Sequence, residues 1–112
     1  MPIMFGFARQ RRELLEAELR RMLPELAPFG ALRAWLVGDL ARGRAGPESE
    51  LELVIVQETE EPFQRRPDFW TAHLRPRVGA RFLVYTPEEV EALDEVDPLL
   101  VDAQRHGETL VG

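Results

Sequence analysis

The sequence predicts an α/β (α+β) domain: a small mixed β-sheet of three to four strands with helices packed mainly on one face. Two observations lead to this prediction. The chain has 112 residues, a length typical of one domain, so we expect residues 1–112 to form a single unit. Apolar residues recur at steps of three and four in some segments and alternate or run together in others, and the two kinds of segment follow each other along the chain.

The first predicted helix covers residues 9–23, where leucines recur at helical spacing, and we expect Pro24 to end it. A second helix is predicted at 64–74, and loops or short helical turns at 38–46 and 57–62. Strands are predicted where aliphatic, β-branched and aromatic residues gather, namely at 32–37, 50–56, 81–85 and, as a short closing strand, 109–111.

Two further helix starts carry capping signals. In Thr86-Pro87-Glu88-Glu89, threonine is suited to the N-cap, proline to the first helical position and glutamate to the third. Asp97-Pro98 repeats this chemistry, and Gly107 is expected to end the helix that follows. We expect Trp35 and Trp70 to pack in the core.

Composition excludes several kinds of chemistry. All fourteen basic residues are arginine and cysteine is absent, which rules out disulfides, thiolate or lysine nucleophiles and cysteine-based zinc sites. The two histidines, His73 and His106, are too few for a histidine-rich metal site and are expected at the surface, so any metal would be held by carboxylates, as Mg²⁺ and Mn²⁺ are. A net charge of −6 disfavours nonspecific DNA binding. No apolar run approaches the ~20 residues of a membrane span, and no secretory signal is evident, so we expect a cytoplasmic protein.

The most informative stretch is Gly38-Asp39-Leu40-Ala41-Arg42-Gly43, followed by Ser49-Glu50-Leu51-Glu52-Leu53. It resembles the signature of the minimal nucleotidyltransferases, which share the fold of DNA polymerase β: a strand ending in Gly-Ser, then x-Ala-Arg-Gly, a short loop, and Ser-Asp-x-Asp-Leu on the next strand. Six positions match at that spacing: Gly38, Ala41, Arg42, Gly43, Ser49 and Leu53. The likeness continues through the Thr-Pro-Glu-Glu run to residues 97–107.

The resemblance implies a metal-dependent phosphoryl-transfer site. Carboxylates two residues apart on a strand point to one face, and with a third from a neighbouring strand they can hold the two Mg²⁺ ions that clamp the reacting oxygens. By this likeness, Glu50 and Glu52 take the metal-binding, catalytic positions. The residues expected to bind the nucleotide are Gly38, Asp39, Arg42 and Gly43.

The chain departs from the family at each functional position. Asp39 replaces the serine and places a carboxylate where a triphosphate should sit. Glu50 and Glu52 replace aspartates and add a methylene, which Mg²⁺ tolerates poorly. Arg81 stands where the third aspartate belongs. We therefore predict that Arg81 pairs with Glu50, Glu52 or both in place of a metal. For Arg42 we expect support of the loop or a local pair with Asp39.

Three functions follow as alternatives. The first is a catalytically impaired or inactive nucleotidyltransferase-fold protein that needs no cofactor and acts as a binding, antitoxin-like partner. The resemblance implies a helical HEPN-type partner, and a homodimer also fits, with the apolar residues 1–8 as a subunit contact or packed back on the domain. The second is an active enzyme that uses Mg²⁺ or Mn²⁺ to move a nucleoside monophosphate from an NTP to a protein or small molecule. The third is RNA binding by residues 65–81, where arginines alternate with aromatics; an amphipathic helix explains this stretch more simply, so nucleic acid is not expected.

Overall fold

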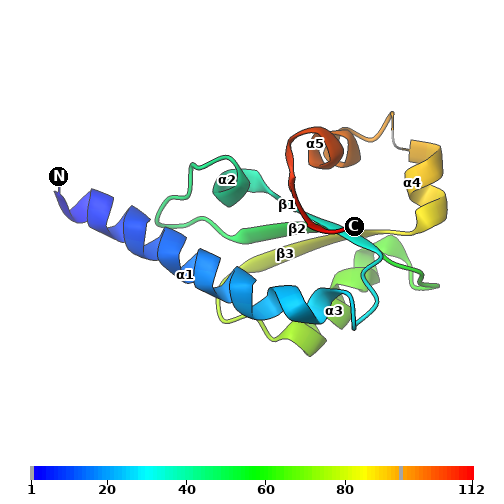
Figure 1. Cartoon of the computed structure of the whole chain (residues 1–112), viewed down its shortest axis with the longest axis horizontal. Coiled ribbons are helices and arrows are strands. Elements are labelled where there is room, and N and C mark those ends of the chain that lie inside the picture. The colour runs from blue at the N-terminus through cyan, green and yellow to red at the C-terminus, as the bar shows by residue number, and fades with distance from the viewer. Residues whose placement is uncertain (1, 94) are drawn as a thin grey trace.

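Four strands form one mixed sheet in the order β3-β2-β1-β4 in the computed structural model, which describes residues 2–93 and 95–112 (Figure 1). The strands are β1 (Arg33–Val37), β2 (Leu51–Val56), β3 (Ala80–Tyr85) and β4 (Glu108–Val111). Strand β1 is antiparallel to both β2 and β4, whereas β2 and β3 run parallel. The register sets Glu52 between Val37 of β1 and Arg81 of β3. The predicted mixed sheet is confirmed, with each strand within about a residue of its expected position.

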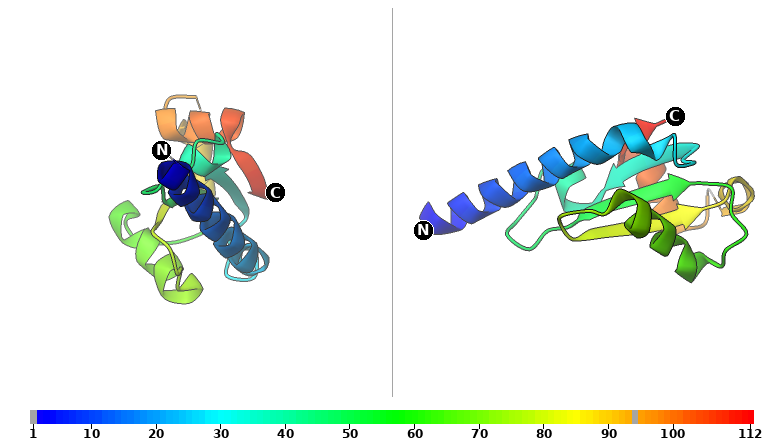
Figure 2. Two further views of the ribbon diagram at one scale, coloured as in Figure 1. Left: turned by 90° about the vertical axis from the view of Figure 1, so that its left-hand side faces the viewer. Right: turned by 90° about the horizontal axis from the view of Figure 1, so that it is seen from below.

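Helices lie on both faces of this sheet (Figure 2). The helices are α1 (Pro2–Leu26), α2 (Gly38–Ala41), α3 (Arg66–Leu74), α4 (Pro87–Leu93) and α5 (Pro98–His106), with a 3₁₀ turn, η1 (Phe63–Arg65), before α3. Helices α1 and α3 cover one face over the larger core, to which they contribute Leu15, Met22, Leu26, Trp70 and Leu74. Helices α4 and α5 cover part of the other face.

The second face needs this cover because β2 is apolar on both sides. Residues 53–56 are all buried, so alternate side chains enter opposite cores. The smaller core contains Trp35, Val54, Val56, Tyr85, Leu100 and Ala103. The larger core lies on one face of the sheet, as expected for helices packed mainly on one face. A second, smaller core lies on the other face, beneath α5. Trp35 and Trp70 are buried, as predicted.

Helix α1 is longer than predicted at both ends. Pro24 lies inside its last turn and does not end it. Proline removes one backbone hydrogen bond of a helix, but Met22 and Leu26 on either side of it are fully buried, and this packing holds the last turn in place. At the other end, the first turns project beyond the sheet (Figures 1 and 2). Side chains 1–5 lie outside the described part of the chain, so the packing expected for residues 1–8 can be followed only from Gly6 onward.

The predicted caps are formed. The Thr86 hydroxyl accepts from the Glu89 amide (3.2 Å), and the Glu89 carboxylate accepts from the Thr86 amide (2.9 Å), which is a capping box at the start of α4. Asp97 caps α5 by accepting from the Leu99 amide (2.9 Å), and Gly107 is its C-cap. Among the described helices, none is long and apolar enough to cross a membrane.

Candidate functional site

The predicted site residues gather around a small pocket of about 220 Å³ on the α5 side of the sheet. Its floor comes from β1, β2 and β3, and its rim from the start of α2 and from α5. The lining residues are Val37, Gly38, Arg42, Glu52, Val54, Arg81, Leu83, Leu99 and Asp102. Gly38, Arg42, Glu52 and Arg81 are thus brought together, whereas Asp39, Gly43 and Glu50 do not line the pocket.

Glu52 lies directly against Gly38. The backbone of Gly38 has φ +80°, a left-handed conformation that favours glycine. A Cβ atom at this position would collide with the Glu52 carboxylate. Glycine is therefore required here both by the turn and by the neighbouring side chain, and the Glu52 carboxylate fills the space above the turn that ends β1.

Arg81 stands beside Glu52 on the adjacent strand. Its Nη1 atom lies 4.0 Å from Glu52 Oε1, at the outer limit of an ion pair. The Arg81 side chain is 64% exposed and that of Glu52 is 32% exposed, so water screens the attraction. Arg81 thus neighbours one of the two carboxylates that were predicted to pair with it. Because the pair is exposed and long, it neutralises charge in the pocket but contributes little to the free energy of unfolding.

Glu50 points elsewhere. Its carboxylate packs against Gly79, the residue before β3, where a Cβ atom would collide with it. Glu52 thus contacts the turn after β1 and Glu50 contacts the residue before β3, so the two carboxylates lie against different strands. Within residues 2–93 and 95–112, no group of three or more histidine, aspartate or glutamate side chains is placed to hold a metal ion.

Asp39 ties the following loop together. The Ser49 hydroxyl donates to Asp39 Oδ2 (2.8 Å), and the Gly46 amide donates to the same hydroxyl (2.8 Å). Ser49 is only 8% exposed. The Asp39 carboxylate, expected beside a triphosphate, is therefore engaged in closing the loop between α2 and β2.

Arg42 pairs with Asp102, which is not one of the site residues predicted from the sequence. Its Nη2 atom donates to Asp102 Oδ1 (3.0 Å) and Oδ2 (3.1 Å), which links the α2 loop to α5. The expected local pair with Asp39 is wrong because Asp39 is taken by Ser49. Sixty residues separate Arg42 from Asp102, and no spacing rule in the sequence connects them.

The charges of the pocket balance. Two guanidinium groups, of Arg42 and Arg81, each face one carboxylate, of Asp102 and Glu52. The remaining surface is apolar and includes Leu99, which is 54% exposed. A triphosphate with its metal ions needs uncompensated charges that converge on it, whereas this pocket offers paired charges around an apolar floor.

In the arginine-rich segment 65–81, Arg66 is buried, whereas Arg65, Arg75, Arg77 and Arg81 are exposed. Arg66 is 8% exposed and donates to the Val84 carbonyl oxygen (3.0 Å) and the Glu89 carboxylate (2.6 Å). The hydrogen bond from Arg66 lowers the pKa of Glu89. Arg66, Trp70 and Leu74 form the buried stripe of α3, which is the amphipathic helix expected.

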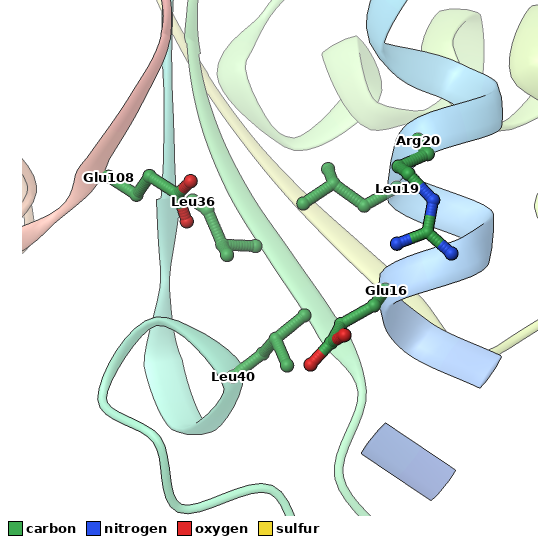
Figure 3. A pocket seen from close by; sticks show the side chains of 6 residues that line it. All are labelled: Glu16, Leu19, Arg20, Leu36, Leu40 and Glu108. Carbon is green, nitrogen blue, oxygen red and sulfur yellow. The ribbon is translucent and has the colours of Figure 1, made fainter. Parts of the chain in front are cut away.

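A second pocket of about 280 Å³ lies on the opposite face, between α1 and the β1–α2 turn. Figure 3 shows its lining: Glu16, Leu19 and Arg20 of α1, Leu36 of β1, Leu40 of α2 and Glu108 of β4. Its interior is formed by leucines and its rim by charged groups. It contains none of the predicted metal or nucleotide residues.

The sequence matches no protein-family model and no curated protein. The fold, in contrast, is similar to a known one. A crystal structure of a Sulfolobus solfataricus protein described as a putative nucleotidyltransferase superimposes with a TM-score of 0.57, over 77% of this chain and 79% of that one, at 16% sequence identity. Identity this low is evidence for the fold alone, and the chain has a nucleotidyltransferase-like fold.

Proposed function

We propose that the protein uses the nucleotidyltransferase fold for binding and regulation and does not transfer nucleotides. The observation that carries this proposal is the placement of Glu50 and Glu52. Two-metal catalysis needs carboxylates that converge on the same ions, but one of these side chains packs against Gly79 and the other against Gly38.

Arg81 supports the same conclusion. Its guanidinium is charged at all accessible pH values and lies 4.0 Å from the Glu52 carboxylate. A divalent cation at Glu52 would be repelled by this fixed positive charge. In the nucleotidyltransferase pattern, an anionic ligand occupies this position on the third strand.

The binding partner that we propose is a helical protein of the HEPN type, with this chain in an antitoxin-like role. This part of the proposal rests on the resemblance of residues 38–53. The pocket supports it in one respect: paired charges around an apolar floor, next to the exposed Leu99, suit a protein side chain better than a polyanion.

The alternative is an active enzyme dependent on Mg²⁺ or Mn²⁺. The neighbour in fold, described as a putative nucleotidyltransferase, favours it, as does the position of Glu52 beside the Gly38 turn. In that case Glu52 would be a metal ligand, and Asp102 and Glu50 would have to move toward it.

Manganese binding separates the two functions. We expect no saturable Mn²⁺ binding to the wild-type protein by electron paramagnetic resonance, and no change with Glu52→Gln. The matched control is Glu48→Gln, which removes an exposed carboxylate from the preceding loop. Stoichiometric Mn²⁺ binding that Glu52→Gln abolishes and Glu48→Gln preserves would contradict the proposal and favour the enzyme alternative.

A further inference from the structure

The pocket of about 280 Å³ beside α1 is built from four elements and lies on the face of the sheet opposite to Glu52. Its floor is formed by one leucine each from α1, β1 and α2: Leu19, Leu36 and Leu40. Leu36 is only 1% exposed, and the other two are partly buried against the larger core, so packing holds the floor in place. Small-molecule sites begin at about 300 Å³, and this pocket therefore has room for a small ligand with an aliphatic part.

Three charged side chains stand around this floor (Figure 3). Glu16 and Arg20 both belong to α1 and are four residues apart, so they are neighbours on one face of the helix. Glu108 belongs to β4 and lies on the other side of the leucines. Two carboxylates and one guanidinium give the lining a net charge of −1. A ligand that matches this lining carries a net charge of +1.

These charged groups are available to a ligand. Among the described side chains, neither Arg20 nor Glu108 forms an ion pair. Glu16 has a long pair with Arg12, at 3.7 Å, and both side chains are about half exposed, so this pair is weak. The pocket near Glu52 differs, because each of its arginines already has a carboxylate beside it.

We propose that this pocket binds a free basic amino acid with an aliphatic stem, such as L-lysine. Its α-carboxylate pairs with Arg20 and its α-ammonium with Glu16, because these opposite charges are neighbours on α1 just as the two ligand groups are neighbours on one carbon atom. The methylene stem lies across the leucines, as lysine stems do on apolar surfaces. The ε-ammonium pairs with Glu108 on the far side.

Simpler ligands leave part of the pocket without a partner. An aliphatic amino acid has no second ammonium group for Glu108, and a diamine has no carboxylate for Arg20. The site lies on the opposite face of the sheet from Glu52, so amino-acid binding stands or falls independently of the proposed function.

Titration of the ¹⁵N-labelled protein with L-lysine, followed by the chemical shifts of the backbone amides, tests the site. We expect saturable shifts at the residues that line the pocket, with a dissociation constant of about 1 mM, because a small ligand in an open pocket gains limited binding energy. No saturable shifts, or shifts that gather at Leu83 and Asp102 of the other pocket, would overturn the proposal.

Three analogues each lack one charged group of lysine. Norleucine lacks the ε-ammonium, cadaverine lacks the α-carboxylate, and Nα-acetyl-lysine lacks the charge of the α-ammonium. Each should bind about fivefold more weakly than lysine, the upper value for a solvent-exposed ion pair. Nα-acetyl-lysine also distinguishes a free amino acid from a lysine at the C-terminus of a peptide. An analogue that binds as tightly as lysine would overturn the proposal.

Variants that remove one charge test the orientation of the ligand. Glu108→Gln should weaken lysine binding about fivefold but leave norleucine binding unchanged, and Arg20→Gln should weaken lysine binding but not cadaverine binding. Glu60→Gln and Arg65→Gln are the matched controls and should change neither. All four side chains are exposed, so each variant should keep the wild-type fold. Equal losses of lysine and norleucine binding in Glu108→Gln would overturn the proposal.

Discussion

A single glycine decides how the candidate site is shaped. Gly38 adopts φ +80°, and the Glu52 carboxylate occupies the space that a side chain at Gly38 would need. The turn after β1 and the acid on β2 therefore share one small volume. Any residue larger than glycine at position 38 would displace the carboxylate that neighbours Arg81.

Gly43 offers a matched comparison for Gly38. It also has a left-handed backbone, with φ +69°, but a Cβ there meets nothing within 4 Å. We expect Gly43→Ala to cost about 1 kcal/mol of unfolding free energy from backbone strain alone. Gly38→Ala adds overpacking against Glu52 and should cost about 2 to 4 kcal/mol. Urea denaturation of both variants measures the difference.

The double variant Gly38→Ala/Glu52→Ala removes the collision and should recover part of the lost stability. Equal costs for Gly38→Ala and Gly43→Ala, with no recovery in the double variant, would show that the Glu52 carboxylate does not occupy this space.

Predictions for single residues were correct where the interacting partners are close in sequence and wrong where the partners are far apart in sequence. The Thr86 capping box needs only partners three residues away, and it is formed. Arg42 binds Asp102 across 60 residues, which no local pattern encodes. Asp39 was expected at a phosphate, but Ser49, ten residues on, takes its carboxylate.

At the scale of elements, a buried glutamate joins α1 to the segment before β3. Glu18 is 5% exposed, and its carboxylate accepts from Arg21 at 2.8 and 2.9 Å and from the Arg77 backbone amide. Arg21 also donates to the Leu74 carbonyl oxygen (2.8 Å) at the end of α3. One charged pair thus connects three segments of the chain.

The hydrogen bonds from Arg21 lower the pKa of Glu18 from 4.5 to about 2, against the opposing effect of burial. A carboxyl whose pKa is lower in the folded state stabilises that state above its unfolded pKa, and the contribution is lost as pH falls through the folded pKa. We expect about 2 kcal/mol, after allowance for solvent near Arg21, to disappear between pH 4.5 and about 2.

Glu18→Gln should therefore lower the melting temperature at neutral pH and flatten its dependence on pH in the acid range. Glu16→Gln, on the same helix with an exposed partner in Arg12, should change neither. A Glu18→Gln variant with the wild-type acid dependence would show that another carboxyl group causes it.

The elements were more predictable than their ends. Hydrophobic periodicity and caps placed the helices and strands because both depend on neighbours in sequence. Pro24 was expected to end α1, but Met22 and Leu26 pack on either side of it and hold the turn. The second core beneath α5 was underestimated because the apolar run 53–56 does not reveal which helix covers each face.

At the scale of the whole molecule, the chain has a nucleotidyltransferase-like fold, and positive and negative side chains are equal in number in the pocket near Glu52. Arg42 with Asp102 and Arg81 with Glu52 leave paired groups where a metal–triphosphate complex would need unpaired ones. Helix α1 extends the molecule to 48 Å along its longest axis and presents Phe7 and Leu14 at its projecting end.

Calorimetric titration with ATP, in the presence of Mg²⁺ and separately of Mn²⁺, tests the proposed loss of nucleotide transfer most directly. We expect no binding heat with either metal and no rise in melting temperature, which a bound nucleotide would produce by mass action. Saturable, metal-dependent ATP binding that Glu52→Gln abolishes and Glu48→Gln preserves would contradict this account and show that Glu52 still holds a metal–nucleotide complex.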